Sequence, residues 1–222
     1  MIIATKIKTP VLKPDFSIED EVFNNEFQDL KSDFFIVGID EAGRGPLCGP
    51  VVAAAVILDQ NNYPEELNDS KKLSSKKRRE IFNQLKNTSK YGVGVVDEQI
   101  IDEINILNAT KLAMKMAFDD LSIKYNITAN FALIDGNFIP QINCSAQAIV
   151  KGDQKSLSIS AASIIAKEIR DEIMFKLDQE FPEYEWSKNK GYATAKHYDM
   201  IKKFGISKYH RQSFKLIKNE NN

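Results

Sequence analysis

Acidic residues end three separate apolar segments of this 222-residue chain. They are Asp40 with Glu41, then Asp135, and then Asp153. Taken singly, each is compatible with a turn, since Asp-Gly and Gly-Asp are common turn dipeptides. If the segments are neighbouring strands of suitable polarity, however, the carboxylates converge, and such a cluster needs a cation to stay ionised. Oxygen ligands of this kind suit Mg²⁺ or Mn²⁺, and two such ions beside a basic surface suit phosphodiester hydrolysis.

The first acids stand in a glycine-rich segment, GIDEAGRGP at 38–46. Adjacent strand residues point to opposite faces, so Asp40 and Glu41 can share one site only if the chain bends, which the glycines allow. The segment is not a dinucleotide fingerprint, because Cys48 stands where a glycine is needed, and it lacks the Gly-Lys-Ser/Thr triplet of a P-loop. Its small residues and single arginine still let backbone N–H groups and a guanidinium approach a nucleic-acid strand.

The net charge of −1 hides an uneven distribution. Residues 186–222 contain nine Lys/Arg and two Asp/Glu, so this stretch carries about +7 and the residues before it about −8. A second basic cluster, 71–79, has no acid inside it. Two solvated surfaces would explain these charges. The more specific interpretation is a polyanion-binding face beside an acidic centre.

Hydrophobic periodicity predicts the elements that must position these residues. The predicted strands are 34–39, 51–58, 91–96, 130–134 and 146–150, and the predicted helices are about 75–86, 107–124, 157–179 and 194–203. Short links make the first three strands antiparallel neighbours, and helices alternate with strands afterwards. This order predicts an α/β domain with one mixed sheet covered by helices, over 34–222, preceded by an extension, 1–33, with a weak helical pattern near 18–30.

Several classes of protein are excluded. The two cysteines, Cys48 and Cys144, form neither a disulfide framework nor a CxxC zinc motif, and the spacing of the only histidines, His197 and His210, does not indicate zinc. The N-terminus has no apolar signal region, and the longest apolar run, 51–58, is too short to span a membrane. We therefore expect a cytoplasmic protein.

Five segments together resemble bacterial ribonuclease HII, in consistent order over roughly 34–215. They are IDEAGRGPLCGPVVAAAVIL, LNDSKKLSSKKR, LIDGN, VKGDQKSLSISAASIIAKEIRD and KGYATAKHYDMIKKFGISKYHRQSF. Arg44 and the short extension favour this type over its sister, ribonuclease HIII. The resemblance implies the ribonuclease H-like fold, a mixed five-stranded sheet flanked by helices with a helical, basic C-terminal region at about 186–222. It also implies hydrolysis of the RNA strand of RNA–DNA hybrids. Single ribonucleotides in duplex DNA would be incised on their 5′ side, leaving 5′-phosphate and 3′-hydroxyl ends.

The resemblance also implies roles for individual residues. The catalytic and metal-binding acids would be Asp40, Glu41, Asp135 and Asp153, with Mg²⁺ or Mn²⁺ in a two-metal mechanism. Gly43, Arg44 and Gly45 match the loop that reads the 2′-hydroxyl, the group that distinguishes RNA from DNA. Tyr192 matches the tyrosine that stacks on the neighbouring sugar. The expected phosphate contacts are Lys71, Lys72 and Arg211. The expected partners are an RNA–DNA hybrid and ribonucleotide-containing duplex DNA, bound by a monomer.

Two other functions stay open at this point: a nuclease or recombinase of the same fold that acts on DNA, and a nucleic-acid-binding protein without activity. The four acids argue against the binding protein, because like charges beside phosphate would only weaken binding. DEAGRGP together with GYAT argues against the DNA nuclease. The sequence leaves open the preferred metal, binding to a sliding clamp, the role of 1–33 and the roles of Cys48 and His210.

Overall fold

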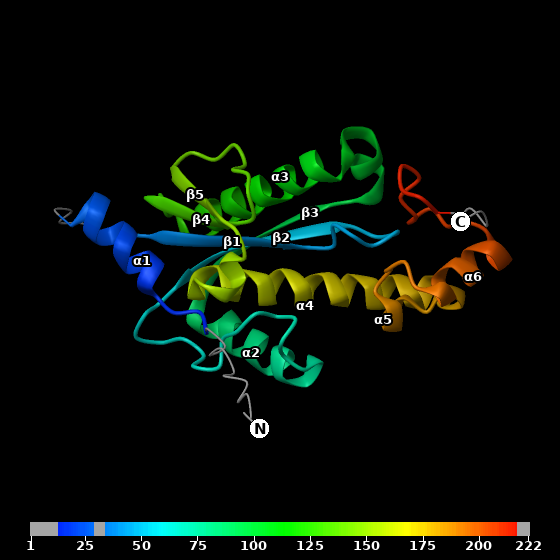
Figure 1. Ribbon diagram of the computed structural model, residues 1–222, viewed down its shortest axis with the longest axis horizontal. Coiled ribbons are helices and arrows are strands. Elements are labelled where there is room, and N and C mark those ends of the chain that lie inside the picture. Colours follow the sequence, from blue (N-terminus) through cyan, green and yellow to red (C-terminus); the bar gives the residue numbers. More distant parts are fainter. Residues whose placement is uncertain (1–12, 29–33, 217–222) are drawn as a thin grey trace, which may run out of the picture.

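The computed structural model describes residues 13–28 and 34–216. Its strands are β1 (Ile36–Ala42), β2 (Val51–Leu58), β3 (Ser89–Val96), β4 (Phe131–Asp135) and β5 (Ser145–Ile149). They form one sheet in the order β3-β2-β1-β4-β5 (Figure 1). β1, β2 and β3 pair antiparallel, whereas β1 with β4 and β4 with β5 pair parallel. The predicted mixed sheet is therefore confirmed, with its antiparallel strands first along the chain.

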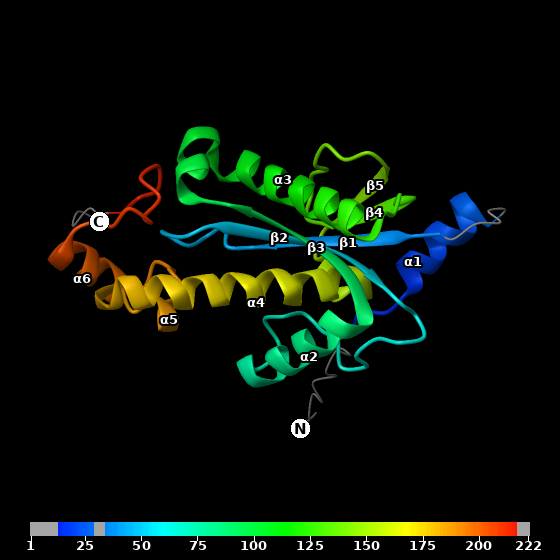
Figure 2. The ribbon, with the colours of Figure 1, turned by 180° about the vertical axis from the view of Figure 1, so that it is seen from behind.

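Helices cover both faces of the sheet. The α-helices are α1 (Ser17–Val22), α2 (Ser75–Thr88), α3 (Glu98–Tyr125), α4 (Leu157–Glu180), α5 (Trp186–Asn189) and α6 (Ala195–Phe204). Three short turns of other helix types are η1 (Phe23–Phe27), η2 (Gly152–Gln154) and η3 (Pro182–Tyr184). Figures 1 and 2 show α3 on one face of the sheet and α4 with α2 on the other.

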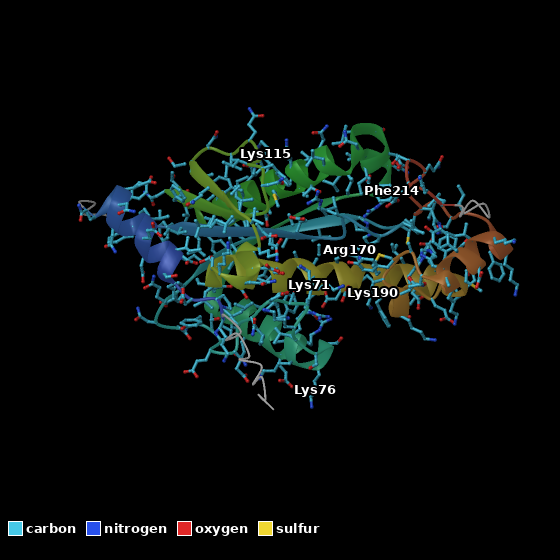
Figure 3. All side chains as sticks on the ribbon, viewed as in Figure 1. Lys71, Lys76, Lys115, Arg170, Lys190 and Phe214 are labelled. Carbon is cyan, nitrogen blue, oxygen red and sulfur yellow. The ribbon has the colours of Figure 1, made fainter. Side chains whose placement is uncertain are left out.

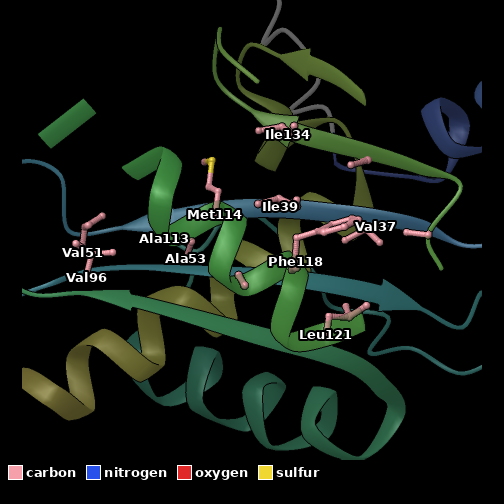
Figure 4. Close-up of a cluster of buried hydrophobic side chains, with 14 of the residues drawn as sticks. Val37, Ile39, Val51, Ala53, Val96, Ala113, Met114, Phe118, Leu121 and Ile134 are labelled. Carbon is pink, nitrogen blue, oxygen red and sulfur yellow. The ribbon is translucent and has the colours of Figure 1, made fainter. Parts of the chain in front are cut away.

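Alternate residues of the strands supply two separate cores. On the α3 face, Val37 and Ile39 of β1 and Ile134 of β4 pack with Met114 and Phe118 of the helix (Figure 4). On the other face, Ala54, Val56 and Leu58 of β2 pack against α2 and α4. β2 is buried along its whole length, which explains its uninterrupted apolar sequence.

Two elements are longer than periodicity predicts. α3 begins at Glu98, about nine residues early, and contains a break at Asn105, where φ is 65°. The Asn105 side chain accepts the amide N–H groups of Leu107 and Asn108, so it caps a second helical section that matches the predicted helix 107–124. β1 continues through Asp40 and Glu41 to Ala42 instead of ending at Ile39.

Gly38 allows α4 to begin directly against β1. A Cβ at this position would overlap the backbone of Ser158, so only glycine permits this approach. As a result, the first turns of α4 lie beside Asp40, which is two residues further along β1.

The chain is also packed at both ends of the described region. Ile18, Val22 and Phe27 pack against β4, β5 and Ile159, so the predicted helical pattern near 18–30 is confirmed as far as η1. Trp186 is fully buried in a third cluster, made by α5, α6 and the residues around them, and is a packing residue. None of the helices in the described ranges combines the length and hydropathy needed to cross a bilayer.

Candidate active site

The sheet register brings the predicted acids to one edge. Ile39 of β1 pairs with Ile134 of β4 in parallel, so Asp40 and Asp135 occupy the next positions on neighbouring strands. η2, which carries Asp153, follows β5, the strand on the other side of β4. Asp135 Oδ1 accepts the amide N–H of Gly152 at 2.6 Å and so ties the two strand ends together.

Cations from the loops pair with this acidic edge. Lys71 Nζ lies 3.4 Å from Asp153 Oδ2, although 80% of the Lys71 side chain is exposed. Arg44 Nη1 lies 3.4 Å from Glu41 Oε1. Both pairs consist of an exposed base and a largely buried acid, so the charged ends of Lys71 and Arg44 mark the solvent side of the acidic cluster.

The electrostatics of the cluster favour a bound cation. Burial raises the pKa of Asp40 well above its usual value, and the nearby carboxylates of Glu41 and Asp135 raise it further. Burial also raises the pKa of Asp153, an effect that Lys71 opposes. No three of these four acids have oxygens that all lie within 4.8 Å of one another, but they are desolvated and raise one another's pKa, so they ionise together only with compensating positive charge. Their oxygens are the donors that Mg²⁺ and Mn²⁺ prefer, so the residues fit a hard divalent ion.

Two buried arginines hold the carbonyl groups of the glycine loop, residues 43–50. Arg211 donates to the carbonyls of Gly43, Arg44, Pro46 and Gly49 at 2.6–3.1 Å. Arg170 donates to those of Cys48, Pro50 and Lys190 at 3.0–3.2 Å. The expectation that Arg211 contacts phosphate is therefore wrong, because its side chain is fully enclosed and its donors are used by the loop.

Gly43 and Gly45, two of the three glycines of the loop, have different surroundings. Gly43 has φ +102°, and a Cβ there would overlap the side chain of Arg170 inside the protein. A Cβ on Gly45 would meet only Tyr192, at 3.7 Å. Tyr192 itself is 46% exposed, so Gly45 and Tyr192 form an accessible pair at the edge of the loop. Gly43 is thus required by the fold, whereas the space at Gly45 is open.

The basic cluster 71–79 is less available to a polyanion than its sequence indicates. Arg78 is buried and pairs with Glu168 and Asp171 of α4. Arg79 also pairs with Glu168. Lys71 and Lys72 remain exposed. In Figure 3, Lys71 and Lys190 are labelled along α4, and Arg170 of this helix lies toward the sheet.

The fold brings Cys48, His197 and His210 close together, although their spacing in the sequence does not indicate a common site. Their Sγ and ring nitrogen atoms all lie within 4.8 Å of one another. Protein hydrogen bonds occupy the ring nitrogens of both histidines. The Ser207 amide donates to Nδ1 of His210, so Nε2 of this ring carries the proton and points to His197 Nε2, 3.2 Å away. Burial also raises the pKa of the Cys48 thiol to about 12, which disfavours a thiolate ligand.

His197 connects this buried network to the surface tyrosine. Its Nδ1 donates to the carbonyl oxygen of Tyr192 at 3.0 Å. The single lone pair of its Nε2 is shared by the Trp186 indole N–H at 3.1 Å and the His210 Nε2–H at 3.2 Å. His210 lies under the loop, 1% exposed, rather than beside a substrate or at a surface turn. The histidines thus support the backbone that carries Tyr192.

Comparison with known proteins agrees with this geometry. The family model described as Ribonuclease HII matches residues 37–217. The chain is 52% identical to a ribonuclease HII of Magnetococcus marinus over 184 residues, which is 82% of this chain and 85% of that protein. Among solved structures, ribonuclease HII in the PCNA complex from Archaeoglobus fulgidus is similar with a TM-score of 0.68 and 25% identity, covering 84% of this chain and 98% of that one.

The fold is shared more widely. Bst-RNase HIII in complex with Mn²⁺ is similar with a TM-score of 0.69 and 19% identity, covering 82% of this chain and 68% of that one. The match of the family model and the identity to a ribonuclease HII each extend over most of the chain. This chain therefore belongs to the ribonuclease HII family of endoribonucleases.

Proposed function

We propose that this endoribonuclease, besides cutting the RNA strand of RNA–DNA hybrids, incises duplex DNA on the 5′ side of a single embedded ribonucleotide. The products would be a 5′-phosphate and a 3′-hydroxyl. The observation that carries this proposal is the position of the glycine loop, because residues 43–45 lead directly from the acids of β1 to the exposed Tyr192. A detector for the 2′-hydroxyl would thus adjoin the acidic cluster.

The acids Asp40, Glu41, Asp135 and Asp153 would hold divalent metal, Mg²⁺ or Mn²⁺. A divalent ion bound there supplies a Lewis acid for the phosphate and a water of lowered pKa. The donor set supports this assignment, since buried carboxylates with raised pKa values lack sufficient positive partners among the described residues. A protein of the same fold, Bst-RNase HIII, has been solved with Mn²⁺.

The remaining residues would bind and orient the substrate. Because Arg211 and Arg170 hold the carbonyl groups of the loop, we expect the substrate to approach at Gly45 and Tyr192. A rigid tyrosine ring can press on the sugar next to the ribonucleotide at low entropic cost. Lys71 and Lys72 would contact phosphates, which positions the duplex without reading its sequence.

Cleavage of three end-labelled duplexes tests the proposal: DNA with one ribonucleotide, an RNA–DNA hybrid, and DNA alone, each with and without Mg²⁺ or Mn²⁺. We expect metal-dependent cutting of the first two and a ribonucleotide with a 5′-phosphate on the downstream product. Tyr192→Ala should lose at least about tenfold more activity on the single ribonucleotide than Tyr192→Phe, which keeps the ring. Equal cutting of the all-DNA duplex, or wild-type incision by Tyr192→Ala, would contradict the proposal.

A further inference from the structure

The N-terminal segment 13–28 packs against the chain that carries Asp153. This segment precedes the residues matched by the family model, 37–217. Asp15 forms a parallel bridge with Ser156: its amide donates to the carbonyl of Lys155, and its carbonyl accepts from Leu157. The backbone of the segment is thus joined to the junction between η2 and α4.

Glu19 adds a buried side-chain contact at the same junction. Its Oε1 accepts from Ser156 Oγ at 2.7 Å and from the amide of Ser158 at 3.1 Å, and the residue is 3% exposed. Ser156 in turn accepts from the amide of Ile159. Glu19 therefore satisfies one of the free N–H groups in the first turn of α4, where a negative charge is also favourable.

This contact has an energetic cost. Glu19 Oε2 is buried without a hydrogen-bond partner among the described residues. A buried oxygen without a hydrogen-bond partner destabilises the folded state. The contacts of Oε1 and the packing of α1 must offset this cost for the segment to stay in place.

η2 is the element between this junction and the acidic cluster. The amides of Lys155 and Ser156 both donate to the carbonyl of Gly152, so the turn around Asp153 is closed on itself. On its other side, Asp135 binds the Gly152 amide, and Asp69 Oδ2 accepts from Gln154 at 3.2 Å. A shift of the junction would therefore move Asp153 relative to Asp135.

We propose that Glu19 is a positioning residue for the active site: through Ser156 and Ser158 it fixes the turn that presents Asp153 to the metal. The inference rests on the proposed metal-dependent function. It assigns a role to residues 13–28, for which the motifs of the sequence provide none. Partners that orient metal ligands change metal affinity by about 10–100-fold when they are removed.

The test compares Glu19→Ala with Glu21→Ala, an exposed acid on the same helix, α1. Three quantities are measured on the full chain: the Mn²⁺ dissociation constant by calorimetry, amide hydrogen exchange of residues 151–158, and the melting temperature. We expect Glu19→Ala to raise the dissociation constant about tenfold or more. It should also speed amide exchange in 151–158 relative to exchange in the strands of the sheet, while Glu21→Ala changes neither the dissociation constant nor this exchange. If Glu19→Ala does not fold, Glu19→Gln, which keeps the volume and one acceptor oxygen, should show a smaller change of the same sign.

A second comparison separates positioning from simple stabilisation. In an Asp153→Asn background, Glu19→Ala should lower the melting temperature as before, but should no longer change Mn²⁺ affinity. A lower melting temperature with unchanged Mn²⁺ affinity in the wild-type background would overturn the proposal, as would an affinity loss that persists in the Asp153→Asn background. Failure of the wild-type protein to incise a ribonucleotide would refute the proposed function instead, because metal binding and exchange are measured without substrate.

Discussion

Gly43→Ala and Gly45→Ala should have different effects: the first should mainly lower the stability of the protein, and the second should mainly lower its activity. A Cβ on Gly43 would overlap Arg170, whereas a Cβ on Gly45 would lie 3.7 Å from Tyr192 and touch no other described part of the fold. Gly43→Ala therefore perturbs the buried support of the loop. Gly45→Ala adds one methyl group to the face where we expect the substrate.

The structure provides the magnitudes. At φ +102°, Gly43→Ala costs about 1–2 kcal/mol of backbone strain. Displacing Arg170 weakens its hydrogen bonds to the carbonyls of Cys48, Pro50 and Lys190, each worth about 1.5–3 kcal/mol for a charged donor. Losing one of these bonds gives a total of about 2.5–5 kcal/mol, or roughly 5–20 °C in melting temperature for a domain of this size. Gly45→Ala should stay within about 0.5 kcal/mol of wild type.

Urea unfolding and cleavage kinetics on DNA with a single ribonucleotide measure both effects. Gly45→Ala should fold normally and lose about a hundredfold in rate if the methyl group displaces the scissile phosphate by roughly 1 Å. Gly43→Ala should lose stability first. A Gly43→Ala protein as stable as wild type would refute the packing of the loop on Arg170, and full activity of Gly45→Ala would show that the substrate does not approach there.

Three further predictions concern the acids, the histidines and the buried arginine. Asp135→Asn should abolish metal-dependent cleavage and leave hybrid binding intact; gel shift and cleavage assays check this, and unchanged turnover would contradict it. Burial, and then the neighbouring His197, lower the pKa of His210 to about 4 from 6.5. As the pH falls, the unfolded chain therefore binds a proton at this histidine before the folded protein does. The free energy of unfolding should fall by on the order of 1–3 kcal/mol as the pH drops from about 6.5 to about 4. Urea unfolding should find a weaker dependence of this free energy on pH in His210→Gln. Arg211→Gln should slow incision at least about tenfold without changing the salt dependence of binding; a slope reduced by about one would restore a phosphate contact.

Local patterns in the sequence were sufficient for most of the architecture. The apolar runs of β2 and β4 and the spaced apolar residues of α4 depend on neighbours within a few positions, and they predicted these elements closely. The acids at the ends of the segments predicted convergence on one condition, that their strands are neighbours of suitable polarity. The parallel pairing of β1, β4 and β5 meets that condition, because parallel strands present their carboxyl ends at the same edge of a sheet. The resemblance to ribonuclease HII was likewise visible in the motifs alone.

Burial and charge balance were decided only by the tertiary structure. Arg78 belongs to a run without acids, yet Glu168, ninety positions away, neutralises it. Arg211 lies in a basic stretch of the sequence and has the side chain expected of a phosphate contact, but the glycine loop encloses its donor groups. In the sequence, Glu19 is one acid among several in the N-terminal extension. Only the structure shows that the first turn of α4 begins against its side chain. In each case the environment of the side chain is a sum over residues distant in the chain, which periodicity and local composition do not contain.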